Sequence, residues 1–329
     1  MFLIYVLIGV GVGLMLANQK PINNAVRQVI KSPFQATFIS FLISSLITGI
    51  VALFSGTHLF PTFRFIFNNP WWLYLGGVVA AIYIASNIIL FPKIGVVETV
   101  VIPSLGQIIF GVLLSQISAS GIFGHKGFFE FVKPIALDWK IILGSLLGLI
   151  GIYITSVIAS NKNSKEMKII VHAIGGTATG GELLAWRIWA FIVGGLTSIQ
   201  QVINGALGKY LNSSPQAAFL IFFIGLVIVA LVALIKDKSI IPLNKIREIP
   251  WWGWLGGGFG ALVGIGRVMI VPELGPAQTA MIVLFGSILG SLFVQQLGWW
   301  RTKKANIHPW QIIGLIVMLI GIALINNLF

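Results

Sequence analysis

The sequence places one carboxylate inside an apolar stretch where the chemistry of proton exchange is available. Glu98 lies in the run Gly95–Val96–Val97–Glu98–Thr99–Val100, and no other acid lies so deep in an apolar stretch. Desolvation favours the protonated form of a carboxyl group, so such a residue can exchange protons near neutral pH. Proton coupling or recognition of an organic cation would follow. The structural alternative is a glutamate at a helix N-terminus near the membrane surface, stabilised by the helix dipole.

Uncharged polar residues form a second group of candidates. Paired amides recur near the ends of two apolar stretches, and two more amides lie within other stretches: Gln19, Asn23, Gln200, Asn204, Asn87 and Gln107. Buried amides can hydrogen-bond a polar solute without the cost of a charge. They can equally hold helices together by hydrogen bonds. Both interpretations stay open from the sequence.

Three further charged residues lie within or beside apolar stretches. Arg267 lies in the last third of its stretch, where it can extend to the membrane surface or bind an anionic substrate group or Glu273. A charge at the centre of a membrane helix costs about 2.5–3.5 kcal/mol, which makes such residues functional candidates. Lys93 and Glu273 occupy equivalent positions of an internal repeat. They would either form one gate pair or lie at opposite membrane faces.

Several kinds of chemistry are excluded or disfavoured by composition. The chain has no cysteine, which excludes disulfides and thiolate sites, and its four histidines are scattered without metal-ligand spacing. The segment from Gly175 to Gly181 lacks the Gly-Lys-Ser/Thr of a phosphate-binding loop. The eight acids are spread thinly, whereas a membrane enzyme needs a catalytic cluster. We therefore expect neither enzymatic activity nor a metal or other cofactor.

Composition indicates an integral membrane protein. Hydrophobic residues make up 57% of the 329 residues and charged residues 9%, against about 25% charged in soluble domains. A spanning helix needs roughly 20 apolar residues. Ten stretches qualify or nearly so: Phe2–Ala17, Phe34–Phe54, Trp71–Leu90, Gly95–Ile117, Ile141–Ser160, Trp186–Ala206, Pro215–Ile235, Trp251–Val271, Gly275–Leu297 and Pro309–Leu328. The first is the shortest, and we expect its helix to extend toward Asn24. The net charge of +13 lies mostly in the intervening loops, so we attribute it to membrane topology and not to nucleic-acid binding.

The two halves of the sequence repeat each other. Pro70–Trp71–Trp72 with Leu75–Gly76–Gly77 recurs 180 residues later as Pro250–Trp251–Trp252 with Leu255–Gly256–Gly257. Pro92–Lys93–Ile94–Gly95 recurs as Pro272–Glu273–Leu274–Gly275, and Gly144 and Gly151 recur as Gly314 and Gly321. We divide the chain into a first five-helix repeat at 1–160, a cytosolic linker at 161–185 and a second repeat at 186–329.

A repeat with an odd number of spans must enter the membrane in the opposite direction, as in many secondary transporters. The loops on one side carry fifteen of the Lys and Arg residues and those on the other side six. The positive-inside rule then places both termini outside the cytoplasm. The expected fold is all-α and membrane-integral, with about ten helices as a 5+5 inverted repeat, either a monomer or a homodimer.

These motifs resemble the YdcZ-type family of bacterial inner-membrane proteins, within the drug/metabolite transporter superfamily. The resemblance rests on Gln19 with Asn23, on Ser32–Pro33–Phe34–Gln35–Ala36, on the Pro-Trp-Trp and Pro-Lys-Ile-Gly motifs and on Gly106–Gln107. It implies an EamA-like fold, and a fused form of five-span proteins that pair antiparallel. It also implies an exporter whose first spans in each half surround the substrate cavity.

The sequence and the resemblance together favour a secondary transporter. It would move a small organic metabolite or organic cation across the inner membrane by alternating access, with Glu98 as the proton-coupling group and membrane lipids as surroundings. A lipid flippase or a structural membrane protein without transport activity is the alternative.

Overall fold

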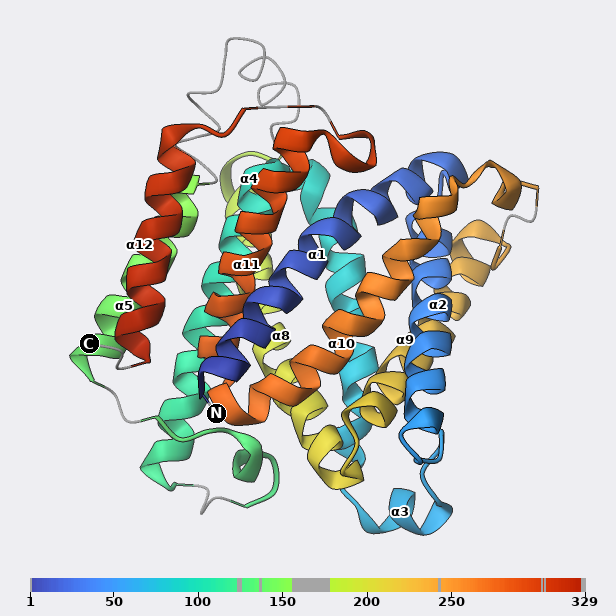
Figure 1. Ribbon diagram of the computed structural model, residues 1–329, viewed down its shortest axis with the longest axis horizontal. Coiled ribbons are helices and arrows are strands. Elements are labelled where there is room, and N and C mark those ends of the chain that lie inside the picture. The colour runs from blue at the N-terminus through green and yellow to red at the C-terminus, as the bar shows by residue number, and fades with distance from the viewer. Residues whose placement is uncertain are drawn as a thin grey trace.

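The computed structural model describes residues 2–122, 126–135, 138–155, 178–241, 244–302, 304 and 306–326. They form a bundle of α-helices (Figure 1). The α-helices are α1 (Phe2–Ile30), α2 (Pro33–Phe54), α3 (Phe63–Asn68), α4 (Leu75–Ser120), α5 (Trp139–Tyr153), α8 (Gly180–Leu211), α9 (Ser214–Asp237), α10 (Leu255–Leu274), α11 (Pro276–Leu297) and α12 (Pro309–Ile325). Short 3-10 helices are η1 (Trp71–Tyr74), η2 (Gly127–Phe131), η4 (Ile246–Glu248), η5 (Trp251–Trp254) and η6 (Trp299–Arg301).

The apolar helices match the ten predicted spans in order. Within the described residues, seven helical segments are long and apolar enough to cross a membrane. Three shorter apolar segments, Trp71–Tyr83, Trp139–Tyr153 and Pro309–Ile325, occupy the positions of the third, fifth and tenth spans. The all-α membrane fold expected from composition is confirmed.

Helix α1 extends past the apolar stretch Phe2–Ala17, as expected from the sequence, and runs beyond the predicted limit near Asn24. It continues through Pro21 to Ile30, and its 29 residues measure about 44 Å at 1.5 Å per residue. Figure 1 shows it crossing the bundle at a steep tilt. The polar residues beyond Ala17 do not end the helix because they face other helices: Gln19, for example, lies against Gly260. Helix α8 likewise begins at Gly180, before the predicted Trp186.

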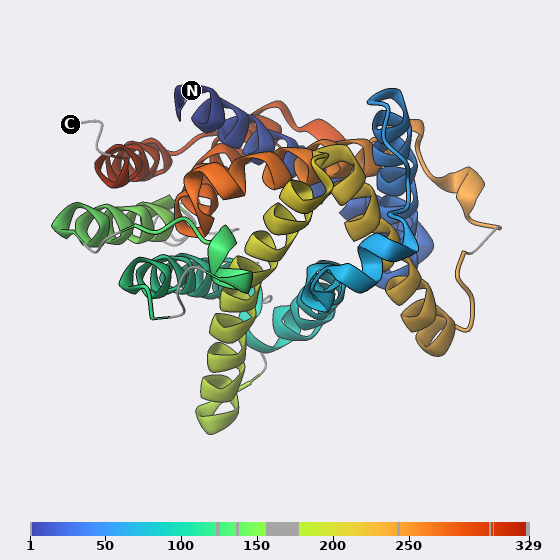
Figure 2. The same ribbon diagram turned by 90° about the horizontal axis from the view of Figure 1, so that it is seen from below.

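Helix α4 combines the third and fourth predicted spans. It is helical over 46 residues and would be about 69 Å long if straight, twice the hydrocarbon thickness of a bilayer. Its N-terminal arm (cyan) and its C-terminal arm (teal) instead run in opposite directions (Figure 1), with α8 between them (Figure 2). The prediction of two spans is confirmed, while the expected turn at Pro92–Gly95 carries no break in helical assignment.

In the second half, the helix is interrupted at the equivalent position, Gly275. Gly275 separates α10 from α11 with φ of +87° and ψ of 162°, a conformation that glycine adopts readily. Pro276 follows at the first helical position, where its missing N–H costs nothing. The first half has Val96 at that place, and its N–H permits the helical hydrogen bonding to continue. The halves therefore differ here for a local covalent reason.

Contacts between α5 and α12 establish that the halves are inverted. A Cβ atom added to Gly144 would lie 2.6 Å from the carbonyl oxygen of Gly321, and one added to Gly151 would lie 2.6 Å from that of Gly314. The early residue of one helix thus meets the late residue of the other, so the two helices are antiparallel. Because α5 and α12 are equivalent in the repeat, the halves point in opposite directions. The start of α1 and the end of α12 lie on one face (Figure 1).

The most extensive helix pairings join one half to the other. They are α4 with α8, α1 with α11, α2 with α9, and α5 with α12. Close approach recurs at equivalent points: Gly13 of α1 meets the backbone of Val283 in α11, and Gly194 of α8 meets the backbone of Pro103 in α4. Small residues permit such contacts in membranes, where lipid removes the hydrophobic drive between helices. The two halves are therefore interdigitated.

Helix α12 shows how the sequence separates lipid from core. Its buried residues include Gly314, Met318 and Gly321, which face α5. Its exposed face is uniformly aliphatic: Ile312, Ile313, Ile316, Leu319 and Ile320 are 42–53% exposed. In water such a stripe would promote association, but in a bilayer it meets acyl chains. The helix therefore turns its glycines toward α5 and an aliphatic stripe toward lipid.

We predict that Gly151→Ala destabilises the protein, because the new Cβ would collide with Met318 Cγ and lie 2.6 Å from the carbonyl oxygen of Gly314. Overpacking of this kind costs about 1–3 kcal/mol. The measurement is unfolding by titrated SDS, followed by tryptophan fluorescence. Gly11→Ala is the matched control, since nothing lies within 4 Å of its new Cβ. Equal stability of the two variants would contradict the close α5–α12 contact.

Candidate functional site

Paired amides lie where α1 crosses α10. The helices are antiparallel, with Asn23 against Gly256 and Gln19 against Gly260. A Cβ added to Gly256 would collide with Asn23 Oδ1, and one added to Gly260 would lie 2.7 Å from Gln19 Nε2. Asn23 Nδ2 also donates to Ser40 Oγ of α2 at 3.3 Å. The glycines leave room for the amides, so the repeated Gly-Gly motif and the repeated amides form a single structural device.

The same device recurs in the other half. Gln200 Nε2 of α8 donates to the carbonyl oxygen of Gly76 at 3.0 Å, and a Cβ added to Gly76 would collide with Asn204 Oδ1. Asn204 Oδ1 is buried without a hydrogen-bond partner among the described residues. The predicted amides are therefore brought together with the opposite half, one set at each crossing. Their hydrogen bonds hold helices together, and Asn204 keeps one acceptor unused.

The structure shows fewer contacts for the other two predicted amides, Gln107 and Asn87. Gln107 lies half-buried in the C-terminal arm of α4, and its backbone carbonyl accepts a 2.5 Å hydrogen bond from Ser198 of α8. Asn87 lies within α4, but its side chain falls outside the described residues. Neither residue is therefore linked by a side-chain contact to the α1–α10 crossing.

Glu98 is paired with an arginine of the opposite half. Its Oε2 accepts from Arg187 Nε at 2.8 Å and its Oε1 from Arg187 Nη2 at 2.5 Å, a bidentate geometry. The Glu98 side chain keeps 34% of its surface exposed, so it is not enclosed in apolar surroundings. In this conformation the carboxylate is paired and reachable by solvent, which differs from the isolated carboxylate that the sequence suggests.

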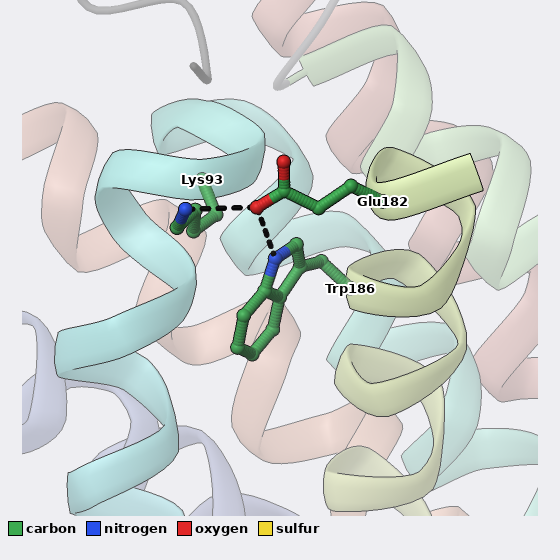
Figure 3. Close-up of polar contacts among 3 residues, drawn as sticks. All are labelled: Lys93, Glu182 and Trp186. Atoms are coloured by element: carbon green, nitrogen blue, oxygen red, sulfur yellow. Dashed lines mark hydrogen bonds and ion pairs between the residues drawn. The ribbon is translucent and has the colours of Figure 1, made fainter. Parts of the chain in front are cut away.

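A second ion pair lies beside the first. Lys93 Nζ is 2.8 Å from Glu182 Oε1, and the same oxygen accepts from Trp186 Nε1 at 3.2 Å (Figure 3). Lys93 and Glu98 belong to α4, whereas Glu182 and Trp186 belong to α8. Both ion pairs therefore connect the first half to the second. We call Lys93, Glu98, Glu182 and Arg187 the ionic latch.

Glu273 takes part in a different set of contacts. Glu273 Oε1 lies 3.8 Å from Lys209 Nζ, and the Glu273 carbonyl oxygen accepts from Lys133 Nζ at 2.7 Å. Glu182 and Lys209 lie near opposite ends of α8, a helix of 32 residues and about 48 Å. Lys93 and Glu273 are thus at opposite faces of the bundle and do not form one gate pair.

Arg267 is intermediate in exposure, and its Nε is buried without a hydrogen-bond partner among the described residues. The positive charge of Lys20 on α1 and the hydroxyl of Tyr83 on α4 are the groups with which it interacts electrostatically. The structure does not pair Arg267 with Glu273, because the Glu273 carboxylate lies 3.8 Å from Lys209 Nζ instead.

Three residues of this region are not recognisable as site residues by hydropathy. The sequence pattern is typical of a cytosolic anchor at Arg187, of a linker at Glu182 and of a topology-determining charge at Lys20. A usable signal is nevertheless present, because Lys93 and Glu98 have the same spacing as Glu182 and Arg187, with the charges reversed. Two parallel helices with such spacing align both opposite-charge pairs at once.

Comparison with known proteins agrees with the architecture. A family described as "Putative inner membrane exporter, YdcZ" matches residues 4–154 and again residues 185–324. A solved structure described as "Crystal structure of protein" is similar with a TM-score of 0.67 and 15% identity, and the match covers 98% of each chain. That likeness concerns the fold alone. The comparison with curated proteins found no match.

The family match covers both halves of the chain in the same order as the internal repeat, and the helices that it covers are the interdigitated ones. The chain therefore belongs to the YdcZ family of inner-membrane exporters, in a form that carries both halves in one polypeptide.

Proposed function

We propose that the protein is a secondary active exporter that moves a small organic metabolite across the inner membrane by alternating access. Family membership supports transport, and the inverted, interdigitated halves support a mechanism in which one half rocks against the other. The two crossings of amides and glycines would then be the surfaces between which the solute passes.

The ionic latch is the observation that carries this proposal. It consists of two ion pairs, and each connects α4 of the first half to α8 of the second. Exposed ion pairs contribute little net stability because water screens them. Breaking the latch therefore costs little compared with separating packed helices. A carrier needs contacts of this kind, which close one face and yet open in every cycle.

We further propose that protons drive the latch through Glu98. A proton on Glu98 removes its negative charge and hence the attraction for the Arg187 guanidinium, while Lys93 and Glu182 remain as the weaker, single-contact pair. A positively charged arginine would then face a neutral acid, and the segments of α4 and α8 that carry the latch could move apart. The 34% exposure of Glu98 provides access for the proton.

The orientation proposed from the distribution of Lys and Arg places the ionic latch on the cytoplasmic side of the membrane. The fifteen-to-six distribution of Lys and Arg favours a cytoplasmic position for the loops at the latch face and an outside position for both termini. The start of α1 and the end of α12 lie together on the other face of the bundle (Figure 1). A closed latch would then correspond to a carrier sealed from the cytoplasm.

Export is tested by metabolite release. Cells that overproduce the wild-type protein should accumulate at least one solute in the medium relative to cells with an empty vector. With Glu98→Gln that release should fall roughly tenfold or more, because the variant cannot cycle between charged and neutral states. Untargeted mass spectrometry of the medium provides the measurement. Identical media from wild-type and vector cells would count against export, and full release by Glu98→Gln would count against proton coupling.

Latch opening is tested by cross-linking, which the absence of native cysteine makes clean. In the variant Lys93→Cys/Glu182→Cys, cross-linking by a short bifunctional maleimide should fall as pH is lowered, since protonation of Glu98 releases the remaining pair. Adding Glu98→Gln should keep the yield low at every pH. The exchange Glu98→Arg/Arg187→Glu should restore it. A yield independent of both pH and Glu98 would disprove the latch.

Orientation is tested by labelling single cysteines in intact spheroplasts with an impermeant maleimide. Ser55→Cys, at the end of α2 on the face of the termini, should be labelled from outside. Glu248→Cys, in η4 on the other face, should react only after lysis. Both positions are exposed, so access to reagent alone decides the result. The opposite labelling pattern would reverse the assigned orientation.

A further inference from the structure

Two cations inside the bundle have no acidic partner among the described residues. They are Lys20 of α1 and Arg267 of α10. The acids near the bundle are already engaged: Glu98 with Arg187, Glu182 with Lys93, and Glu273 with Lys209. Asp237 accepts a hydrogen bond from Ser32. Within the described part of the chain, no ion pair reaches either cation, and neither the latch nor the proposed proton step makes use of them.

The positions of these cations are fixed by the crossing of α1 and α10. Gln19 contacts Gly260, and Val12 contacts Gly266, so Lys20 and Arg267 lie on the two helices within the same crossing. Lys20 is exposed and Arg267 is intermediate in exposure, and the two positive charges are close enough to repel each other. Arg267 Nε is among the buried atoms left without a partner in the described residues.

The internal repeat shows that the positive charges of Lys20 and Arg267 are not shared by both halves. The position equivalent to Arg267 in the first half is Asn87, and the position equivalent to Lys20 in the second half is Gln201. Gln201 is buried and donates to the Thr197 carbonyl of its own helix. The fold therefore accommodates uncharged residues at both places. The cations are added to one side of the pseudo-symmetric interior.

We propose that Lys20 and Arg267 bind an anionic group of the transported solute, a carboxylate or a phosphate, at the α1–α10 crossing. This inference rests on the proposed export function and narrows its substrate class. Two like charges close together within a membrane-spanning bundle repel each other, and an anion between them relieves the repulsion and gives the buried Arg267 Nε a hydrogen-bond acceptor. Arginine stays protonated even there, so it cannot escape the cost by losing its charge.

The surroundings suit an organic anion better than an organic cation. The amides Gln19 and Asn23 lie one turn or less from Lys20 on α1 and can hydrogen-bond the uncharged part of a solute. A cationic solute would meet two positive charges and, among the described residues, no carboxylate at this crossing. The organic cation that the sequence also allows is therefore the weaker candidate for this site. A phosphate could also belong to a lipid headgroup, and the choice of probes separates the two sources.

The test is ligand-dependent thermal stability of the purified full-length protein in an uncharged detergent at constant ionic strength. The probes are succinate, glycerol 3-phosphate, the neutral analogue succinamide, choline, and phosphatidylglycerol added to the micelles. Succinate or glycerol 3-phosphate should raise the melting temperature of the wild type, and succinamide and choline should not. Lys20→Gln or Arg267→Gln should weaken the apparent affinity about tenfold or more, the loss expected for a charged hydrogen bond.

Matched variants separate charge from folding. Arg267→Lys keeps the charge and should retain stabilisation, and Lys236→Gln/Arg247→Gln removes two exposed cations elsewhere and should behave as wild type. If Arg267→Gln does not fold, Lys20→Gln carries the test alone. Unchanged anion affinity in Lys20→Gln/Arg267→Gln, stabilisation by choline, or stabilisation by phosphatidylglycerol without either free anion would overturn the inference.

The outcome is separable from that of the export proposal. Binding in detergent requires no movement across a membrane. Stabilisation by choline would refute the anion site and leave metabolite release untouched, whereas anion binding without any metabolite release would refute export and leave the site standing.

Discussion

Close backbone contact between the two halves is the constraint on which this bundle depends. Lipid offers helices no hydrophobic drive to associate, so they associate through packing at short range. Glycine permits that range at Gly144 against Gly321 and at Gly13 against the backbone of α11. Since these contacts lie between halves and not within them, the inverted arrangement is itself what allows the chain to pack. Because the helices of the two halves are interdigitated, the halves do not pack as two separate bundles.

Polar groups are distributed according to the same geometry. At the α1–α10 crossing, glycines leave space that amides occupy, and the amides bring hydrogen bonds where a larger residue would bring only bulk. Between residues 93–98 of α4 and 182–187 of α8, charges take the place of amides because that part of the contact is exposed.

Much of the fold follows from sequence because its determinants are local. Apolar stretches indicate the ten spans, and the recurrence of Pro-Trp-Trp with Gly-Gly indicates the repeat. The full length of α1 does not follow: an extension toward Asn24 is predicted, whereas the helix continues to Ile30, with Gln19 and Asn23 against residues of the distant second half. Hydropathy cannot distinguish a polar residue in water from one against a partner helix. In α4, Val96 stands where the second half has Pro276, and only the second half is interrupted at this point.

The sequence predicts which residues belong to the candidate site, but it does not predict which residues they contact. Glu98, Gln19 and Arg267 are identifiable because polar residues are rare in apolar stretches. Their partners come from helices far away in the chain, and a single sequence carries little information about such contacts. The repeated spacing of charges on α4 and α8 is an exception, since the order of residues alone displays it.

The pairing of α5 with α12 has a consequence for biosynthesis. Helix α5 ends at Tyr153, and its partner does not begin until Pro309. While the ribosome makes the intervening residues, the glycine face of α5 has no native neighbour, and the same holds for α1 until α11 emerges. The first five helices must therefore wait in the bilayer, loosely associated, and the final structure can form only when the last helix has been inserted.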